Sequence, residues 1–158
     1  MLQPMRLLVV DDDVSVGKLL RAIFEREGWE VDYVSSGEEC ITAVGATPPD
    51  VIVLDHMMPE LTGIETARIL RCGGYTKPIV FFSAYHGPEL EGSARDLDLM
   101  PVSKIDTQTF IRIIDVLGSM PHLRAACSRK EKRSEDNFMR RTVSTFINSR
   151  TASAFRLP

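Results

Sequence analysis

Five short apolar runs, each followed by a stretch with helical periodicity, constrain the fold of this chain more than any other feature. Four runs are nearly continuous, at residues 6–10, 51–54, 78–84 and 99–103, and a fifth at 30–35 alternates apolar and polar residues. Continuous runs of this length are typical of strands buried on both faces of a parallel sheet. Because a helical pattern follows each run, we predict an α/β fold, a doubly wound parallel sheet with helices on both faces.

The segments between the runs predict five helices with recognisable ends. They cover residues 14–28, 36–46, 61–74, 87–98 and 106–119. The apolar face of the first helix is predicted to consist of Leu19, Leu20, Ile23 and Phe24. Gly28 suits the position just after that helix. Ser36 suits the N-cap of the second helix and Asp106 or Thr107 that of the last, whereas Gly92 weakens the fourth.

The chain divides into an acidic body and a basic tail. The net charge of −3 over 158 residues combines −9 over residues 1–120 with +6 over residues 121–158. We therefore expect one domain over 1–120, and a basic linker with an amphipathic helical tail over 121–158. The apolar stripe of that helix is made by Met139, Val143, Phe146 and Ile147. The stripe predicts docking on the chain's own domain, on a second copy or on a partner.

Cysteine spacing and hydropathy exclude several classes of protein. Cys40, Cys72 and Cys127 are far apart and form no C-x-x-C pair, so they predict free thiols rather than a disulfide framework or a zinc site. No apolar stretch approaches the length of a membrane span. No signal peptide is visible, because the first apolar run is short and acidic residues follow it. We expect a cytoplasmic protein that does not contact membranes.

Polar residues gather where the predicted strands end. Ordered along the chain they are Asp11, Asp12, Asp13, Asp55, Ser83, Ser103 and Lys104. The carboxyl ends of parallel strands share one edge of the sheet, where ligands bind in such folds. Carboxylates suit Mg²⁺, and a hydroxyl with a lysine suits phosphoryl oxygens, so the sequence predicts a phosphoryl-transfer site. Asp55, alone at its strand end, is the predicted nucleophile.

Four segments together resemble the receiver domain of bacterial two-component response regulators. They are "LLVVDDD", "VIVLDHMMPELTGIE", "PIVFFSA" and "VSK", and the resemblance runs from residue 5 to about 118. It implies a flavodoxin-like sheet in the order 2-1-3-4-5. It also implies that Asp55 accepts a phosphoryl group from the phosphohistidine of a histidine kinase.

The resemblance further implies a role for each neighbour of Asp55. Mg²⁺ would be held by Asp11, Asp12, Asp55 and the backbone carbonyl of Met57, with Asp12 a direct ligand. Ser83 and Lys104 would bind the phosphoryl oxygens, and Asp13 would be a neighbour of the metal ligands. His56 is interpreted as a solvent-facing turn residue.

Two positions depart from the pattern of the family. Ile105 follows Lys104 where the family usually has proline, so a cis bond is not expected there. Pro101 stands where the family usually has an aromatic residue that rotates on activation. The usual rotation therefore cannot operate, and Tyr85 and His86 are candidate substitutes. A proline in this strand is tolerable because the strand would be the edge of a sheet in the order 2-1-3-4-5.

Other interpretations of the same residues stay open. The acids at 11–13 could simply cap the first helix. Asp11-x-Asp13 also resembles the first motif of haloacid-dehalogenase-type phosphatases, but that leaves the segment around Asp55 unexplained. A flavodoxin-like FMN site would need a phosphate-binding loop where this chain has three acids. A degenerate receiver, acting as a protein-interaction module without phosphorylation, is the remaining alternative.

The expected function is phosphorelay signalling rather than turnover of a substrate. The domain would catalyse only its own phosphorylation and slow dephosphorylation. Its expected partners are a histidine kinase or phosphotransfer protein and a downstream protein target, with a homodimer as one candidate assembly. Direct DNA binding is not expected, because about forty residues are too few for a helix-turn-helix output domain.

Overall fold

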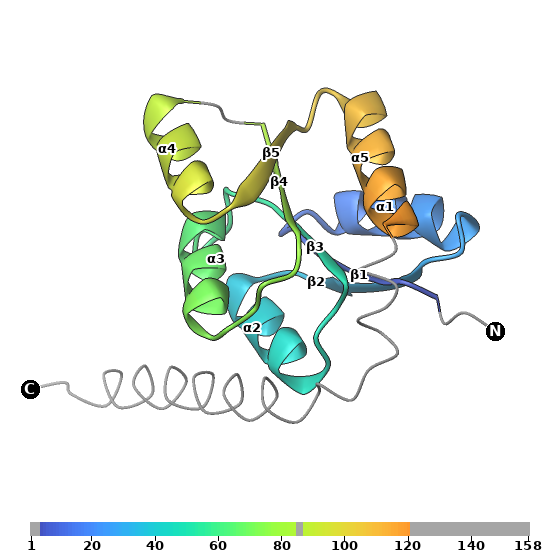
Figure 1. The fold of residues 1–158 in the computed structure, drawn as a ribbon, viewed down its shortest axis with the longest axis horizontal. Helices are drawn as coiled ribbons and strands as arrows, with labels where there is room; N and C mark the ends of the chain where they lie inside the picture. Colours follow the sequence, from blue (N-terminus) through green and yellow to red (C-terminus); the bar gives the residue numbers. More distant parts are fainter. Residues whose placement is uncertain (1–3, 85–86, 121–158) are drawn as a thin grey trace, which may run out of the picture.

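One five-stranded parallel sheet forms the centre of the protein (Figure 1). The computed structural model describes residues 4–84 and 87–120. The strands are β1 (Arg6–Val10), β2 (Glu30–Val34), β3 (Val51–Leu54), β4 (Ile79–Ser83) and β5 (Leu99–Ser103). They are paired in the order β2-β1-β3-β4-β5, all in parallel. The predicted fold class and strand order are confirmed.

Five helices alternate with the strands and cover both faces of the sheet. They are α1 (Val14–Arg26), α2 (Gly37–Ala46), α3 (Gly63–Cys72), α4 (Pro88–Asp96) and α5 (Thr107–Ser119). Helices α1 and α5 pack on one face, and α2, α3 and α4 pack on the other (Figure 1). Within the described residues, no helix combines the length and apolarity that crossing a bilayer requires.

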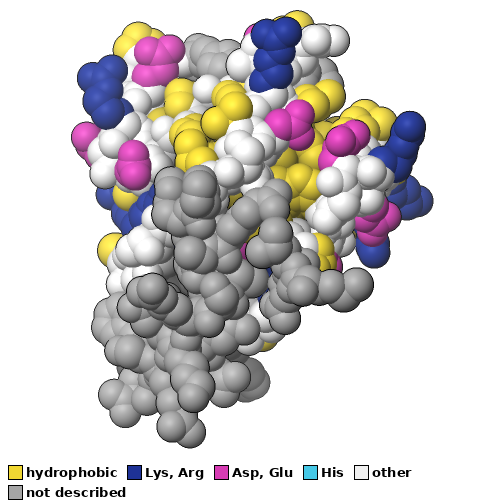
Figure 2. Space-filling model, turned by 45° about the vertical axis from the view of Figure 1, so that its right-hand side comes forward, with side chains coloured by type: hydrophobic (Ala, Val, Ile, Leu, Met, Phe, Trp, Pro, Cys, Tyr) yellow, Lys and Arg dark blue, Asp and Glu magenta, His cyan; other side chains and the backbone are white. Residues whose placement is uncertain are grey.

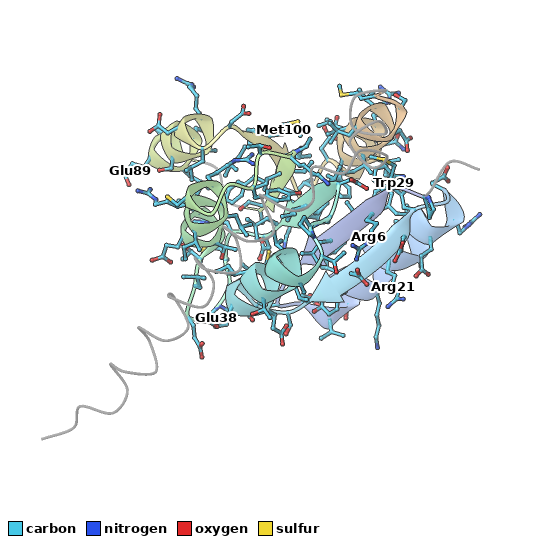
Figure 3. All side chains as sticks on the ribbon, turned by 60° about the horizontal axis from the view of Figure 1, so that its bottom comes forward. Arg6, Arg21, Trp29, Glu38, Glu89 and Met100 are labelled. Atoms are coloured by element: carbon cyan, nitrogen blue, oxygen red, sulfur yellow. The ribbon has the colours of Figure 1, made fainter. Side chains whose placement is uncertain are left out.

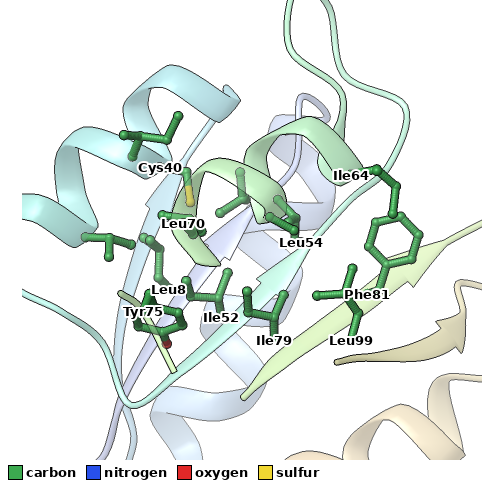
Figure 4. Packing of buried hydrophobic residues seen from close by; sticks show 14 of the residues in the cluster. Leu8, Cys40, Ile52, Leu54, Ile64, Leu70, Tyr75, Ile79, Phe81 and Leu99 are labelled. Carbon is green, nitrogen blue, oxygen red and sulfur yellow. The ribbon is translucent and has the colours of Figure 1, made fainter. Parts of the chain in front are cut away.

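Alternating strand side chains build two separate cores. In β1, Leu7 and Val9 face the α1/α5 side, whereas Leu8 and Val10 face the side of α2, α3 and α4. Figure 4 shows the second core, where strand residues such as Ile52 lie among side chains from the covering helices. Since each face needs an apolar layer, the inner strands β1, β3 and β4 are apolar at nearly every position.

The predicted helix ends agree with the structure. The Ser36 side chain accepts a hydrogen bond from the Glu39 N–H, and Asp106, rather than Thr107, caps α5 by accepting from the Thr109 N–H. Gly28 follows α1 with a φ of +86°, a conformation that glycine adopts without strain.

One part of the predicted core of α1 is wrong. Leu20 and Phe24 are buried as predicted, but Leu19 is 58% exposed. The row made by residues 20 and 24 faces the sheet, and a neighbouring residue points about 100° away around the helix. Apolar residues therefore also reach the surface, where they mix with charged side chains of both signs (Figure 2).

Strand β5 is an edge strand, as Pro101 requires. Pro101 lies opposite Phe81 of β4 and is exposed. Proline cannot donate a hydrogen bond to a ladder, so it is tolerated where no further strand follows. The described residues contain no cis peptide bond, and Ile105 is 88% exposed. The expectations for Tyr85, His86 and the tail at 121–158 fall outside the described residues.

Candidate functional site

The carboxyl ends of β1, β3 and β5 bring two acids and a lysine into contact. Residues 10 and 54 are paired in the ladder, so the next residues, Asp11 and Asp55, lie side by side. Lys104 Nζ lies 2.7 Å from Asp11 Oδ2 and 3.1 Å from Asp55 Oδ1. The side chains of Asp11 and Asp55 are only 2% and 4% exposed. The structure thus places a buried ion-pair cluster at the predicted edge of the sheet.

The three consecutive acids have three different environments. Asp11 Oδ1 accepts a hydrogen bond from the Asp13 N–H at 3.0 Å. Asp13 is the N-cap of α1 and accepts from the Ser15 N–H at 2.8 Å. Asp12 is exposed, and oxygens of Asp11, Asp12 and Asp55 lie within 4.8 Å of one another. Helix capping therefore accounts for one acid of the three and leaves two facing Asp55.

The balance between burial and charge pairing shifts two pKa values. Burial raises the pKa of Asp11, and the hydrogen bonds from Lys104 and from the Asp13 N–H offset this only in part. Burial by itself lowers the pKa of Lys104, but its contacts with Asp11 and Asp55 outweigh burial and raise it. Lys104 therefore stays charged and is the cation that offsets the carboxylates.

Ser83 joins the same edge from β4. It is buried and lies opposite Ser103 in the ladder between β4 and β5. Its carbonyl oxygen accepts a hydrogen bond from the Lys104 N–H at 3.0 Å. This bond ties the end of β4 to the residue that carries the lysine of the cluster.

The loop after Asp55 returns sharply to the site. A Cβ on Gly63 would collide with the carbonyl oxygen of Asp55, so only glycine fits there. The Gly63 N–H donates to the His56 carbonyl at 3.0 Å and closes the loop. Met58 is buried in the core, whereas Met57 is 65% exposed at the mouth of the site. This close approach is the physical reason for glycine in the D-x-x-M-P-x-x-x-G stretch.

His56 is not the solvent-facing residue that the sequence predicted. It is half-buried, and its ring centroid lies 5.5 Å from that of Phe81. Its Nδ1 atom is buried without a hydrogen-bond partner among the described residues. The ring contributes to the wall of a pocket of about 560 Å³ that also includes Ile64 and Leu90. Asp55 lies at the edge of the sheet, whereas His56, the next residue, faces α3 and α4.

Tyr33 and Gly17 lie near the site but belong to no recognisable sequence motif. The Tyr33 hydroxyl donates to the Asp11 carbonyl at 2.8 Å, and its ring packs on Gly17 of α1. Burial and the neighbouring acids raise the pKa of Tyr33, so the phenol stays protonated. In the sequence, only the alternation of β2, which places Tyr33 on the same face as Val31, indicates that the Tyr33 side chain faces inward.

The donor set fits a hard divalent cation. Asp11, Asp12 and Asp55 supply carboxylate oxygens only, and among the described residues no cysteine or histidine joins the group. Mg²⁺ prefers oxygen ligands and keeps several waters, which the exposure of Asp12 allows. The observed cluster could therefore hold one such ion.

A family model and similar individual proteins both indicate one family for this chain. The family described as "Response regulator receiver domain" matches residues 7–102. Response regulator MprA of Mycolicibacterium vanbaalenii is 41% identical over 81 residues, which are 51% of this chain and 35% of MprA. DNA-binding response regulator MtrA of Mycobacterium tuberculosis is 38% identical over 79 residues, 50% of this chain and 34% of MtrA. The chain thus spans about a third of the length of these relatives.

Solved structures agree with the fold and the family. The Francisella response regulator 1452 receiver domain has a TM-score of 0.67 and 27% identity, covering 72% of this chain and 96% of that one. The receiver domain of the Arabidopsis thaliana histidine kinase CKI1, complexed with Mg²⁺ and BeF₃⁻, has a TM-score of 0.65 and 26% identity, covering 75% and 93%. The region that matches the family, residues 7–102, includes most of the sheet and the cluster of Asp11, Asp12 and Asp55, and this chain therefore belongs to the receiver-domain family of two-component response regulators.

Proposed function

We propose that this chain accepts a phosphoryl group on Asp55 from a histidine kinase or phosphotransfer protein, in a Mg²⁺-dependent step that switches its contacts with a downstream protein. The observation that carries the proposal is the contact of Lys104 Nζ with both Asp11 and Asp55, beside the exposed Asp12. Clustered carboxylates held by one lysine would leave excess negative charge, which a divalent cation would neutralise.

The residues present suit an in-line transfer of phosphorus. A carboxylate oxygen of Asp55 attacks the phosphorus of a phosphohistidine, and the new O–P bond forms as the P–N bond breaks. The electron pair of the broken bond leaves with the imidazole nitrogen. Lys104 and Ser83, at the same edge of the sheet as Asp55, would bind the phosphoryl oxygens as the Asp55 carboxylate gives up its charge.

The proposed cation site uses Asp11, Asp12, Asp55 and the carbonyl of Met57. When bound, Mg²⁺ would offset the charge on the phosphoryl oxygens and on the carboxylates. Support comes from the cluster of oxygens and from the CKI1 receiver domain, which was solved with Mg²⁺ and BeF₃⁻. Thermal melts with millimolar Mg²⁺ should show a higher midpoint than melts in EDTA, since a ligand of the native state stabilises it. Asp12→Ala should abolish this shift; a full shift in that variant would remove Asp12 from the site.

The output of the chain is proposed to be protein–protein contact. MtrA is named a DNA-binding response regulator, but only 34% of its length is matched here. We therefore still predict that this chain does not bind DNA directly. A gel-shift assay with the phosphorylated protein would test this prediction.

A phosphorylation-independent interaction module is the second candidate. Pro101 favours it, because this exposed edge residue replaces the aromatic side chain whose rotation the family usually couples to phosphorylation. The intact set of Asp55, Lys104 and Ser83 favours the phosphoacceptor instead, since a module without phosphorylation has no need of a buried charge cluster.

The deciding experiment is phosphorylation by acetyl phosphate and Mg²⁺, followed by intact mass. The wild-type chain should gain one base-labile phosphoryl group, and Asp55→Asn should gain none. Asp13→Asn is the matched control, because Asp13 caps α1 and, within the described residues, forms no ion pair with Lys104. A wild-type chain that gains no phosphoryl group would leave the interaction module as the function; uptake by Asp55→Asn would move the acceptor elsewhere.

A further inference from the structure

Tyr33 links three parts of the site that the motif residues do not connect. It lies on β2, an edge strand that contributes no carboxylate to the cluster. Its hydroxyl donates to the backbone carbonyl of Asp11 at 2.8 Å. Its ring packs so closely on Gly17, in the first turns of α1, that a Cβ there would collide with the ring carbons. The phenol is thus held between β2 and α1, with its polar end on the loop that carries the acids.

The carbonyl that Tyr33 holds belongs to the peptide unit from which Asp12 extends. A peptide unit is planar, so fixing the carbonyl of Asp11 also fixes the direction of the Asp12 N–H and Cα. The ladder to β2 ends just before this point, with the Asp11 N–H donating to the Val34 carbonyl at a rather long 3.3 Å. The hydroxyl of Tyr33 is the next contact with β2 beyond the end of the ladder.

The position of the Asp12 carboxylate depends on the backbone more than the positions of the Asp11 and Asp13 carboxylates do. Asp11 is held by Lys104 and by the Asp13 N–H, and Asp13 is held by the cap of α1. Asp12 is exposed, and the described structure gives its carboxylate no hydrogen bond or ion pair. Its place within 4.8 Å of the other two carboxylates therefore rests on the conformation of the loop.

We propose that Tyr33 is a positioning residue of the cation site, whose hydroxyl holds the Asp11–Asp12 peptide so that the Asp12 carboxylate faces Asp55. The inference rests on the proposed function and adds a residue that does not touch the ion or the phosphoryl group. Its effect is on cation affinity: a loop that must be ordered on binding loses part of the affinity that a held loop keeps. At saturating cation the loop is ordered in either case, so the phosphorylation rate there should depend little on the hydroxyl.

The test is Tyr33→Phe in the full chain, which keeps the ring on Gly17 and removes only the hydroxyl. The initial rate of phosphorylation by acetyl phosphate is measured across a Mg²⁺ titration. We expect the Mg²⁺ concentration at half-maximal rate to rise by about three- to tenfold, the usual size for the loss of one neutral hydrogen bond. The rate at saturating Mg²⁺ should stay within about twofold of wild type. The Mg²⁺-induced shift of the melting midpoint, at a fixed subsaturating concentration, should fall in parallel without any phosphate donor.

Tyr75→Phe is the matched control. The Tyr75 hydroxyl also donates to a backbone carbonyl, that of Pro49 at 3.3 Å, but next to the start of β3 and far from Asp55 along that strand. This variant loses the same kind of bond from the core, so any general effect of destabilisation appears in it too. Its Mg²⁺ dependence should match that of wild type.

A second variant keeps the proposal testable if Tyr33→Phe folds poorly. Gly17→Ala keeps the tyrosine but forces its ring, and with it the hydroxyl, to move, so it should also raise the Mg²⁺ requirement. An unchanged Mg²⁺ requirement in folded Tyr33→Phe, or an equal rise in Tyr75→Phe, would overturn the inference while leaving the proposed function intact. A wild-type chain without Mg²⁺-dependent phosphorylation would overturn both.

Discussion

The Asp11 carboxylate lies beside Lys104 and Asp55 at the end of the sheet, and burial raises its pKa. A group whose pKa is higher in the folded than in the unfolded state binds its proton more tightly in the folded state. Its contribution to stability is complete below the ordinary carboxyl pKa, and it is lost as the pH rises through the raised pKa. Wherever Asp11 is ionised, its buried carboxylate therefore lowers the stability of the folded state.

Asp11→Asn should accordingly make the protein more stable at neutral pH. We expect its free energy of unfolding at pH 7 to exceed that of wild type by about 1 kcal/mol, as is common when a functional site is neutralised. The gain should shrink as the pH falls below the raised pKa of Asp11, because the wild-type carboxyl is then neutral too. Urea denaturation at pH 7 and pH 4 measures both values.

The control for this variant is Asp32→Asn, on an exposed side chain that pairs with Arg6 at 3.0 Å. Exposed pairs contribute little, so the change in stability should stay below about 1 kcal/mol. Figure 3 labels Arg6, the first residue of β1. If Asp11→Asn were less stable than wild type at pH 7, the pairing with Lys104 would outweigh the burial of Asp11.

At the level of elements, α4 is a helix with a half-buried interior glycine that faces open space. A Cβ on Gly92 would meet nothing within 4 Å, and α4 begins without a side-chain cap. Alanine is favoured over glycine inside a helix, so Gly92→Ala should stabilise the protein by about 0.5–1 kcal/mol. Gly63→Ala, where a Cβ would collide with the Asp55 carbonyl, should instead lower both stability and phosphorylation. Thermal melts compare the two; equal effects would show that space at these glycines does not matter.

The connection between β4 and α4 is the element through which we expect the signal to pass. Pro101 cannot rotate like an aromatic residue, so a response confined to β5 is disfavoured. Ser83 lies at the end of β4, and α4 begins five residues later with Glu89 in its first turn (Figure 3). If Ser83 binds a phosphoryl oxygen, the following backbone should move with it.

Hydrogen exchange with and without phosphorylation tests this route. Protection should change in residues 84–92 when the chain carries phosphate, and the Asp55→Asn chain treated alike should show no change. Changes confined to β5 and α5, with none in residues 84–92, would mean that another element carries the signal.

For the whole molecule, the charge of the tail and that of the body are opposite. Residues 121–158 carry a net +6 against −9 for residues 1–120. In α5, the last helix of the described residues, Gly118 packs on Trp29 so closely that a Cβ would collide with the indole ring; Figure 3 labels Trp29. The last helix is thereby held to the body independently of residues 121–158.

Deleting residues 122–158 should therefore leave the receiver folded but change its surface. If the predicted apolar stripe docks on the body or on a second copy, the shortened chain should bind more hydrophobic dye or change its mass in solution. The electrostatic part of such docking should weaken at high salt. The full and the shortened chain are compared in low and in high salt; identical dye binding, oligomeric state and phosphorylation rate in both chains would make the tail a passive extension.

The sequence by itself determined the fold class, the strand boundaries, most helix ends and the edge at which the acids meet. It could do so because strands covered on both faces must be apolar along their length, and because parallel strands end at a common edge. The roles proposed for Asp55, Asp12, Ser83 and Lys104 were also accessible from sequence, through their places at strand ends and their resemblance to the family.

Only the tertiary structure decided which way particular side chains face. Leu19 is exposed and His56 is half-buried because the direction of a side chain depends on which elements cover it, and local pattern does not specify that. The contact of Tyr33 with Asp11 joins residues 22 positions apart on different elements, so no local motif records it. The raised pKa of Asp11 likewise comes from burial beneath several elements, which exists only after the chain has folded.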